Sequence, residues 1–176
     1  MEQNVNIWKA NLTNGLMLGL IGIVYTLVMY FLDLALNKTQ GYLFLLAVIV
    51  ILFFLVKSYR DTYLHGAISY GQALGAGLII CLYYAVIMAI FSYFLYAIID
   101  PELTDKMIAM AEEQMMKKGL SQTQIDTGLA FQKKIMKPGI IAPISIFGSM
   151  FQGLIMSLIV AAFVRKEGNP LIDTEE

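Results

Sequence analysis

Residues 71–99 read GQALGAGLIICLYYAVIMAIFSYFLYAII, a run without one Asp, Glu, Lys or Arg. The hydrocarbon core of a bilayer is about 30 Å thick, and about 20 helical residues cross it. The run is longer than a crossing needs, so we expect it to tilt or to project beyond the bilayer. It is continuously apolar and lacks the alternation of a barrel strand, which predicts a membrane-spanning helix.

Three more apolar runs accompany this one, at about residues 13–36, 41–59 and 139–164. The run at 41–59 is short, but Tyr59 suits the membrane interface and Lys57 can extend its amine to water. The sequence therefore predicts four membrane-spanning helices.

The connection between the third and fourth runs differs from the others. Residues 100–138 carry 12 of the 25 acidic and basic side chains. Pro101 suits the start of a helix and Gly119 its end, while Ser121 and Gln124 have the spacing of a capping box. We therefore expect an all-α fold, an integral membrane four-helix bundle with an extramembrane helical hairpin between the third and fourth spans.

The composition excludes several classes of protein. Hydrophobic residues make up 59% of the chain and charged residues 14%, against about 45–50% and about 25% in a soluble domain. A soluble fold could not hide so much apolar surface, so a soluble enzyme and a disordered chain are excluded. With a net charge of −1, no basic surface is expected for nucleic acid. We expect a single membrane domain over residues 1–176, with the lipid bilayer as its surroundings.

Basic residues near the span ends indicate an orientation. A plain count gives five on the side of the termini and seven on the other side, which by itself favours the hairpin inside. Lys57, Arg60, Arg165 and Lys166, however, directly follow spans in short segments, where such charges count most. We expect both termini in the cytoplasm and the 100–138 hairpin on the periplasmic face of a cell inner membrane.

Small residues recur every three or four positions in three spans, which places them along one face of each helix. Such faces let two backbones approach closely. The first and third spans run in the same direction, so their glycine pairs, in GLMLG and GQALG, lie near the same membrane face, and we expect the two helices to pack closely at that depth. The fourth-span ridge suits either the bundle interior or a homo-oligomer. The residues are Gly15, Gly19 and Gly22 of the first span, Gly71 and Gly75 of the third, and Ser145, Ser149, Gly153 and Ser157 of the fourth.

Asp33 is the one acidic residue within the predicted spans. An intramembrane carboxylate costs roughly 2.5–3.5 kcal/mol and often has a function. Two interpretations stay open: a structural role at the interface, as a cap or an acceptor for Tyr30 or Lys38, and the handling of protons or cations. The candidate polar intramembrane site comprises Asp33, Thr26, Tyr83 and Tyr84.

The sequence contains no HExxH, P-loop, GxSxG or dinucleotide-binding glycine motif. His65 is the sole histidine, and no cysteine or cluster of acidic residues has metal-ligand spacing around it. Cys81 is the sole cysteine, so an internal disulfide is excluded. We expect no catalytic residues, no cofactor and no metal.

Three segments carry a resemblance to a known family: GAISYGQALGAG at 66–77, IIDPELTDKMIAMAEEQMMKKGLSQTQID at 98–126, and VAAFVRKE at 160–167. Together they resemble small bacterial inner-membrane proteins of a DUF4199-like domain of unknown function. The resemblance implies four membrane helices and an extramembrane third connection, but no activity and no functional residues.

These features favour a multi-pass integral membrane protein that is not an enzyme and that has a structural or complex-forming role. Its partner is either a second copy or another membrane protein. The alternative is a small transporter or channel component that uses Asp33 and buried tyrosines. An intramembrane enzyme is the least favoured, since no catalytic set is visible.

Overall fold

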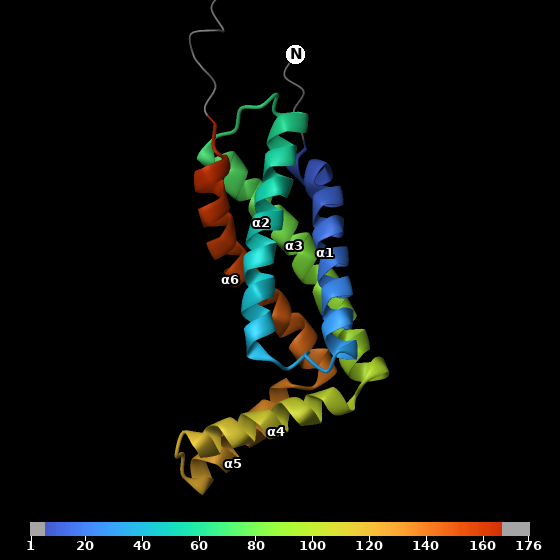
Figure 1. Cartoon of the computed structure of the whole chain (residues 1–176), viewed down its shortest axis with the longest axis vertical. Coiled ribbons are helices and arrows are strands. Elements are labelled where there is room, and N and C mark those ends of the chain that lie inside the picture. Colours follow the sequence, from blue (N-terminus) through green and yellow to red (C-terminus); the bar gives the residue numbers. More distant parts are fainter. Residues whose placement is uncertain (1–5, 167–176) are drawn as a thin grey trace, which may run out of the picture. The chain divides into compact units, whose positions relative to one another are not determined.

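The computed structural model describes residues 6–166, so both ends of the predicted 1–176 domain lie outside the described residues. Apart from an isolated bridge between Ile68 and Lys166, its regular secondary structure is helical, which confirms the all-α fold. The helices are α1 (Ile7–Phe31), α2 (Lys38–Tyr63), α3 (Tyr70–Phe94), the π-helical turn η1 (Leu95–Ile99), α4 (Glu102–Lys117), α5 (Gln122–Ile135) and α6 (Pro138–Val164), and Figure 1 labels α1 to α6.

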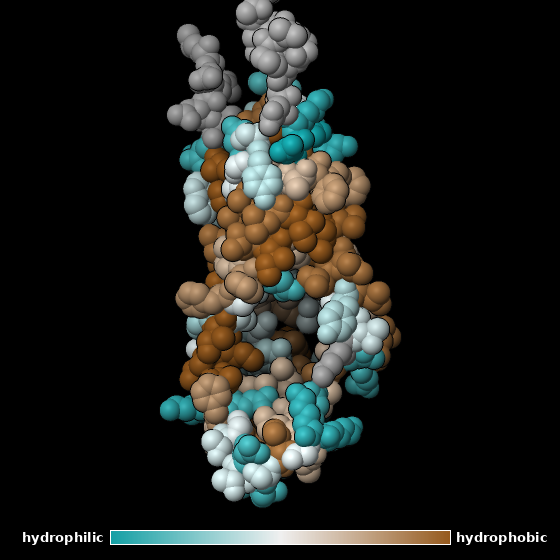
Figure 2. All heavy atoms as spheres, turned by 90° about the vertical axis from the view of Figure 1, so that its left-hand side faces the viewer, coloured by the Kyte–Doolittle hydropathy of each residue, from teal (hydrophilic) through white to brown (hydrophobic). Residues whose placement is uncertain are grey.

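Four of the described segments are long and apolar enough to cross a membrane: α1, α2, α3 continued by η1, and α6. In each, only 22% to 39% of the most apolar stretch is buried inside the protein. Most of their apolar surface therefore needs lipid around it. On the face drawn in Figure 2, apolar side chains form a broad band over the helices, and hydrophilic ones gather where α2 and α6 end.

The chain forms two compact units. The bundle unit holds the residues up to Ile87 and those from Gly148 on, and the hairpin unit holds Met88–Phe147. Helices α3 and α6 each contribute residues to both units.

Helix α1 begins at Ile7, six residues before the predicted span. The side chain of Asn6 caps it by accepting hydrogen bonds from the backbone N–H groups of Trp8 at 3.0 Å and Lys9 at 3.3 Å. An asparagine cap satisfies backbone amides that would otherwise lack a partner, so the helix starts among the polar residues before the predicted span.

The predicted end of the first span is wrong, because α1 stops at Phe31. Asp33 adopts a left-handed backbone with φ 56° and donates its N–H to the carbonyl of Tyr30 at 3.1 Å. The next amide, of Leu34, donates to the carbonyl of Met29 at 2.8 Å. This is a Schellman ending, in which aspartate takes the place usually held by glycine. Asp33 is thus exposed in a turn and does not continue the small-residue face of α1.

Glycines of α1 let it approach α3 in the bundle unit. Gly15 lies directly against the Cβ atom of Tyr83, and a Cβ at Gly19 would lie 2.7 Å from Cδ1 of Ile87. Real Cβ atoms do not come so close to other carbons, so only glycine fits at this crossing.

Helices α1 and α3 do pack closely, as expected, but their two glycine pairs do not meet each other. Gly71 has no atom within 4 Å of an added Cβ, and Gly75 has only Cδ1 of Ile7 at 3.6 Å. The α1 glycines instead receive larger side chains from further along α3. The spacing of two small residues shows that they lie on the same face of one helix. The point at which that helix crosses another depends on how the two helices are rotated and shifted.

Helices α3 and α6 approach each other at two other glycines, one on each helix. A Cβ at Gly77 would lie 2.7 Å from Oγ of Ser157, and one at Gly153 would lie 2.7 Å from Cβ of Cys81. Gly153 and Ser157 of the fourth-span ridge therefore pack on α3 of the same chain.

Polar side chains join α1 to α2 at two levels. The amide of Asn14 donates to Oδ1 of the fully buried Asn11 at 3.2 Å and to the carbonyl of Leu55 at 3.4 Å. Near the other end of α1, the Tyr25 hydroxyl lies 2.8 Å from both the backbone oxygen and Oε1 of Gln40. These bonds satisfy polar groups where lipid offers no partner.

The hairpin unit contains the predicted extramembrane helices. Gly119 ends α4 with φ 72°, and the N–H of Ser121 donates to Oε1 of Gln124 at 3.0 Å, as a capping box requires. Between α4 and α5, an added Cβ at Gly128 would lie 3.0 Å from Cε of Met115. The two helices also bury three apolar side chains, those of Leu103, Ile125 and Leu129.

Candidate functional site

A cavity of about 160 Å³ lies within the bundle unit. Residues of three helices line it: Gly41, Phe44, Leu45 and Val48 of α2, Cys81 and Tyr84 of α3, and Ser149, Gln152 and Met156 of α6. The wall is mainly apolar, and its size is close to that of a cavity that holds one benzene-sized ring.

Three of the lining side chains can donate hydrogen bonds. They are the hydroxyls of Tyr84 and Ser149 and the amide of Gln152. Along the described chain, none of the three makes a side-chain hydrogen bond to another residue; Tyr84 and Ser149 are half-buried and Gln152 is exposed. The cavity thus combines apolar walls with donors that are free to bind a ligand or water.

Small residues leave this space open. A Cβ added at Gly41 would have no atom within 4 Å. The ring of Phe44 is held by stacking on Tyr25 of α1, with ring centroids 4.2 Å apart and planes 13° apart. Cys81 is almost fully buried, and its sulfur lies 4.0 Å from Oγ of Ser157.

The four residues of the predicted polar site are not brought together. Tyr84 lines the cavity together with Ser149, which the sequence grouped with the packing residues. The hydroxyl of Tyr83 donates to a backbone oxygen of α1 at 3.3 Å, and that of Thr26 to a backbone oxygen of its own helix at 2.9 Å. Asp33 lies in the exposed turn, and the side chain of Lys38, one of its expected partners, is outside the described part.

The remaining packing residues do not line the cavity. Gly22 is buried in α1. Ser145 belongs to the hairpin unit and donates to the carbonyl of Ala142 at 2.7 Å.

Sequence reasoning missed Gln152, Cys81 and Met156 as lining residues. Gln152 had a usable signal, since it is the one Asn or Gln within residues 139–164. Cys81 and Met156 had none, because a small or flexible apolar side chain is ordinary in such a run.

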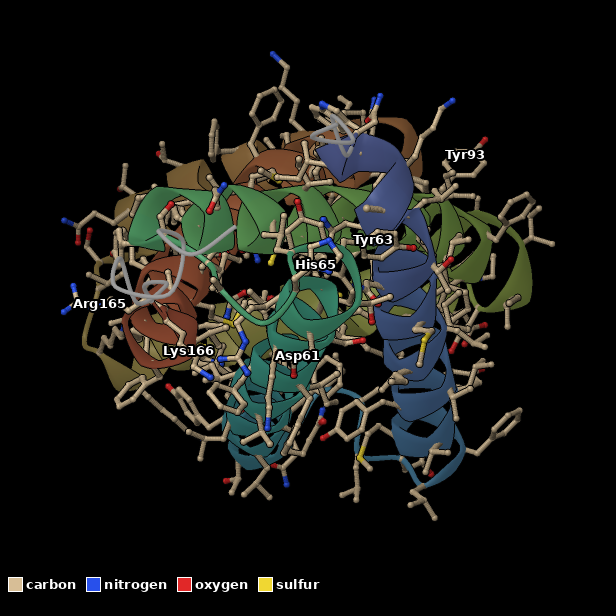
Figure 3. The ribbon with its side chains drawn as sticks, turned by 90° about the horizontal axis from the view of Figure 1, so that it is seen from above. Asp61, Tyr63, His65, Tyr93, Arg165 and Lys166 are labelled. Atoms are coloured by element: carbon tan, nitrogen blue, oxygen red, sulfur yellow. The ribbon has the colours of Figure 1, made fainter. Side chains whose placement is uncertain are left out.

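A second polar cluster lies where α2 and α6 end. Arg60 donates from Nη1 to the carbonyl of Val164 at 3.1 Å and from Nε to Asp61 at 2.7 Å. Ile68 and Lys166 exchange backbone hydrogen bonds of 2.8 and 2.9 Å. Figure 3 looks onto this end, with Asp61 and Lys166 labelled. The bonds fasten the α2–α3 connection and the end of α6 to each other, a structural role.

His65 is exposed in the connection between α2 and α3, with φ 52°. Over residues 6–166, no three His, Cys, Asp or Glu side chains are grouped so that they could hold a metal ion. The cavity is therefore the strongest candidate site.

The sequence model of a family described as protein of unknown function, DUF4199, matches residues 13–166. The chain belongs to this family. The match confirms the resemblance carried by the three segments. No curated protein and no solved structure matches this DUF4199 chain.

Proposed function

We propose that this DUF4199 protein is a non-enzymatic, multi-pass protein of the bacterial inner membrane that assembles with a protein partner through its hairpin. One observation supports this. Phe131 of α5 and Met116 of α4 are 66% and 55% exposed, on helices rich in charged side chains.

The apolar surface of α4 and α5 is only partly used within the hairpin. The helices bury Leu103, Ile125 and Leu129, yet leave a large aromatic ring and a methionine uncovered. Charged residues beside them keep this surface out of the hydrocarbon: Lys117 pairs with Glu113 at 2.6 Å, which holds the pKa of the Glu113 carboxyl below its usual value. Exposed aromatic and methionine side chains next to charges are typical of protein interfaces.

Photocrosslinking tests this partner surface. With the photoreactive residue p-benzoyl-phenylalanine at position 131, we expect a strong adduct to a second copy or to another protein, measured by mass spectrometry after irradiation of whole cells. The same residue at Lys133, which is exposed on the opposite side of α5, is the control and is expected to give little adduct. If position 131 yields only lipid adducts, the hairpin lies on the membrane surface and the proposal fails.

The proposal includes the orientation. Helix α6 separates the hairpin from Arg165 and Lys166, so a spanning α6 puts them on opposite sides of the membrane. Arg165 points away from the end of α6 (Figure 3), and basic residues directly after a span favour the cytoplasm.

Cysteine labelling tests this orientation, because Cys81 is the only native cysteine and is buried. In intact cells, a membrane-impermeant maleimide is expected to label Lys118→Cys but not Arg165→Cys. The Arg165→Cys variant becomes reactive after the membrane is opened. The reverse pattern contradicts the orientation and leaves the partner surface unaffected.

The transport alternative relied on Asp33 as an intramembrane carboxylate. Asp33 lies in the exposed turn after α1, so a transport path through the helices would lack the charged residue on which this alternative relied. The partner proposal therefore has the better support.

A further inference from the structure

We infer that the basic cluster where α2 and α6 end binds the phosphate headgroup of an anionic phospholipid. The cluster comprises Lys57, Arg60 and Asp61 of α2 and Lys166, which follows α6. The inference is independent of the partner proposal and of the orientation. It depends on the contacts that hold the cluster, on its charge and on the apolar side chains beside it.

Hydrogen bonds hold the two helix ends of the cluster together (Figure 3). Arg60 of α2 donates to the carbonyl of Val164 in α6, and Lys166 is fixed by its two backbone bonds to Ile68. Lys57 and Lys166 both interact electrostatically with the carboxylate of Asp61. Basic side chains from two different helices are therefore gathered at one place.

The cluster carries more positive than negative charge. Its three basic side chains surround one carboxylate, and within the described residues Asp61 forms its ion pair with Arg60. The side chains of Lys57 and Lys166 are exposed and have no carboxylate within 4 Å in the same part of the chain. An excess of two positive charges favours an anion, and phosphate oxygens are strong acceptors for ammonium groups.

Apolar side chains beside the cluster favour a lipid over a soluble anion. Phe54 is 58% exposed and precedes Lys57 by three residues, so both lie on the same side of α2. Phe163, in the last turn of α6, is 75% exposed. A phospholipid matches this arrangement, because its acyl chain can cover such a ring while its phosphate lies at the level of the lysines.

Two pairs of lysines provide a matched test. Lys57→Gln combined with Lys166→Gln removes two charges from the cluster and keeps the backbone bonds of Lys166. Lys133→Gln combined with Lys134→Gln removes two exposed charges from α5 in the hairpin unit and is the control. Thermal midpoints of the lipid-free chains are expected to be equal, which shows that both double variants fold.

The measurement is the concentration of dioleoyl-phosphatidylglycerol that half-saturates the full chain in a non-ionic detergent, determined by native mass spectrometry. The full chain includes four acidic side chains at residues 167–176, outside the described residues. Each Lys beside a span strengthens the binding of anionic lipid about fivefold. Lys57→Gln is therefore expected to weaken binding about fivefold and the cluster double variant about 25-fold, while the control pair leaves it unchanged.

Two further ligands identify what the cluster recognises. Phosphatidylcholine, which has no net charge, is expected to bind more weakly than phosphatidylglycerol. Inorganic phosphate at the concentration of the lipid is expected not to displace phosphatidylglycerol, because it has no acyl chain.

Four results would overturn the inference. The first is equal binding of the two phospholipids, and the second is unchanged affinity when Lys57 and Lys166 are replaced. The third is an equal loss in the two double variants, because the lipid would then respond only to net charge. The fourth is displacement by inorganic phosphate, which would make the ligand a soluble phosphate.

Discussion

Replacing Gly15 by alanine is expected to lower the midpoint of thermal unfolding of the detergent-solubilised protein by several degrees. The new Cβ would fall on the Cβ atom of Tyr83 and lie 2.8 Å from Cδ2 of its ring. No side-chain rotation relieves this overlap, because both Cβ atoms are fixed to their backbones. Helices α1 and α3 must therefore separate, and overpacking of this kind costs roughly 1–3 kcal/mol.

Gly71→Ala is the control for this substitution. Its added Cβ has no neighbour within 4 Å, so the variant keeps the packing and gains the better helix propensity of alanine, roughly 0.5–1 kcal/mol. The thermal midpoints of both variants, measured in the same detergent, show whether the added Cβ at Gly15 disturbs the packing of α1 on α3. Equal midpoints would mean that α1 and α3 do not cross at Gly15.

Gly77→Ala is the second substitution with a large expected effect. Its Cβ would lie 2.7 Å from Oγ and 2.9 Å from Cβ of Ser157, which is fully buried on α6. The hydroxyl can rotate but the Cβ of Ser157 cannot, so α3 and α6 must shift apart. We expect a destabilisation of roughly 1–3 kcal/mol. The sulfur of Cys81 lies beside Ser157, so a small thiol reagent should also label Cys81 faster in this variant.

The matched control is two residues away on the same helix. At Gly75 an added Cβ meets only Cδ1 of Ile7 at 3.6 Å, an ordinary contact. Gly75→Ala is therefore expected to keep the thermal midpoint and the labelling rate of Cys81. If Gly75→Ala is the more damaging of the two variants, the α3–α6 packing described here is wrong.

The sequence identified the wrong glycines of α3. The spacing of Gly71 and Gly75 is the usual signature of close helix packing, yet the close approaches on α3 are at Gly77, Tyr83 and Ile87. A spacing rule gives residues that share a face. It cannot tell which face meets a neighbour, because that depends on the rotation of the helix within the bundle.

The candidate site shows the same limit at the level of single side chains. Tyr83 and Tyr84 are indistinguishable in sequence, but successive residues of a helix point about 100° apart. Tyr84 consequently lines the cavity and Tyr83 faces α1. Asp33 was expected on a helix face, and its left-handed backbone instead ends α1.

By itself, the sequence determined the class of fold, the four apolar spans and the charged hairpin. These properties depend on composition summed over many neighbouring residues. Apolar stretches are stable in the bilayer and charged stretches in water, whatever the other helices do. Only the tertiary structure decided where α1 ends, which glycines bring helices together and which polar side chains share a cavity. Each of these depends on atoms from two or three helices meeting within a few ångströms, and a pattern along one segment holds no information about the position of the others.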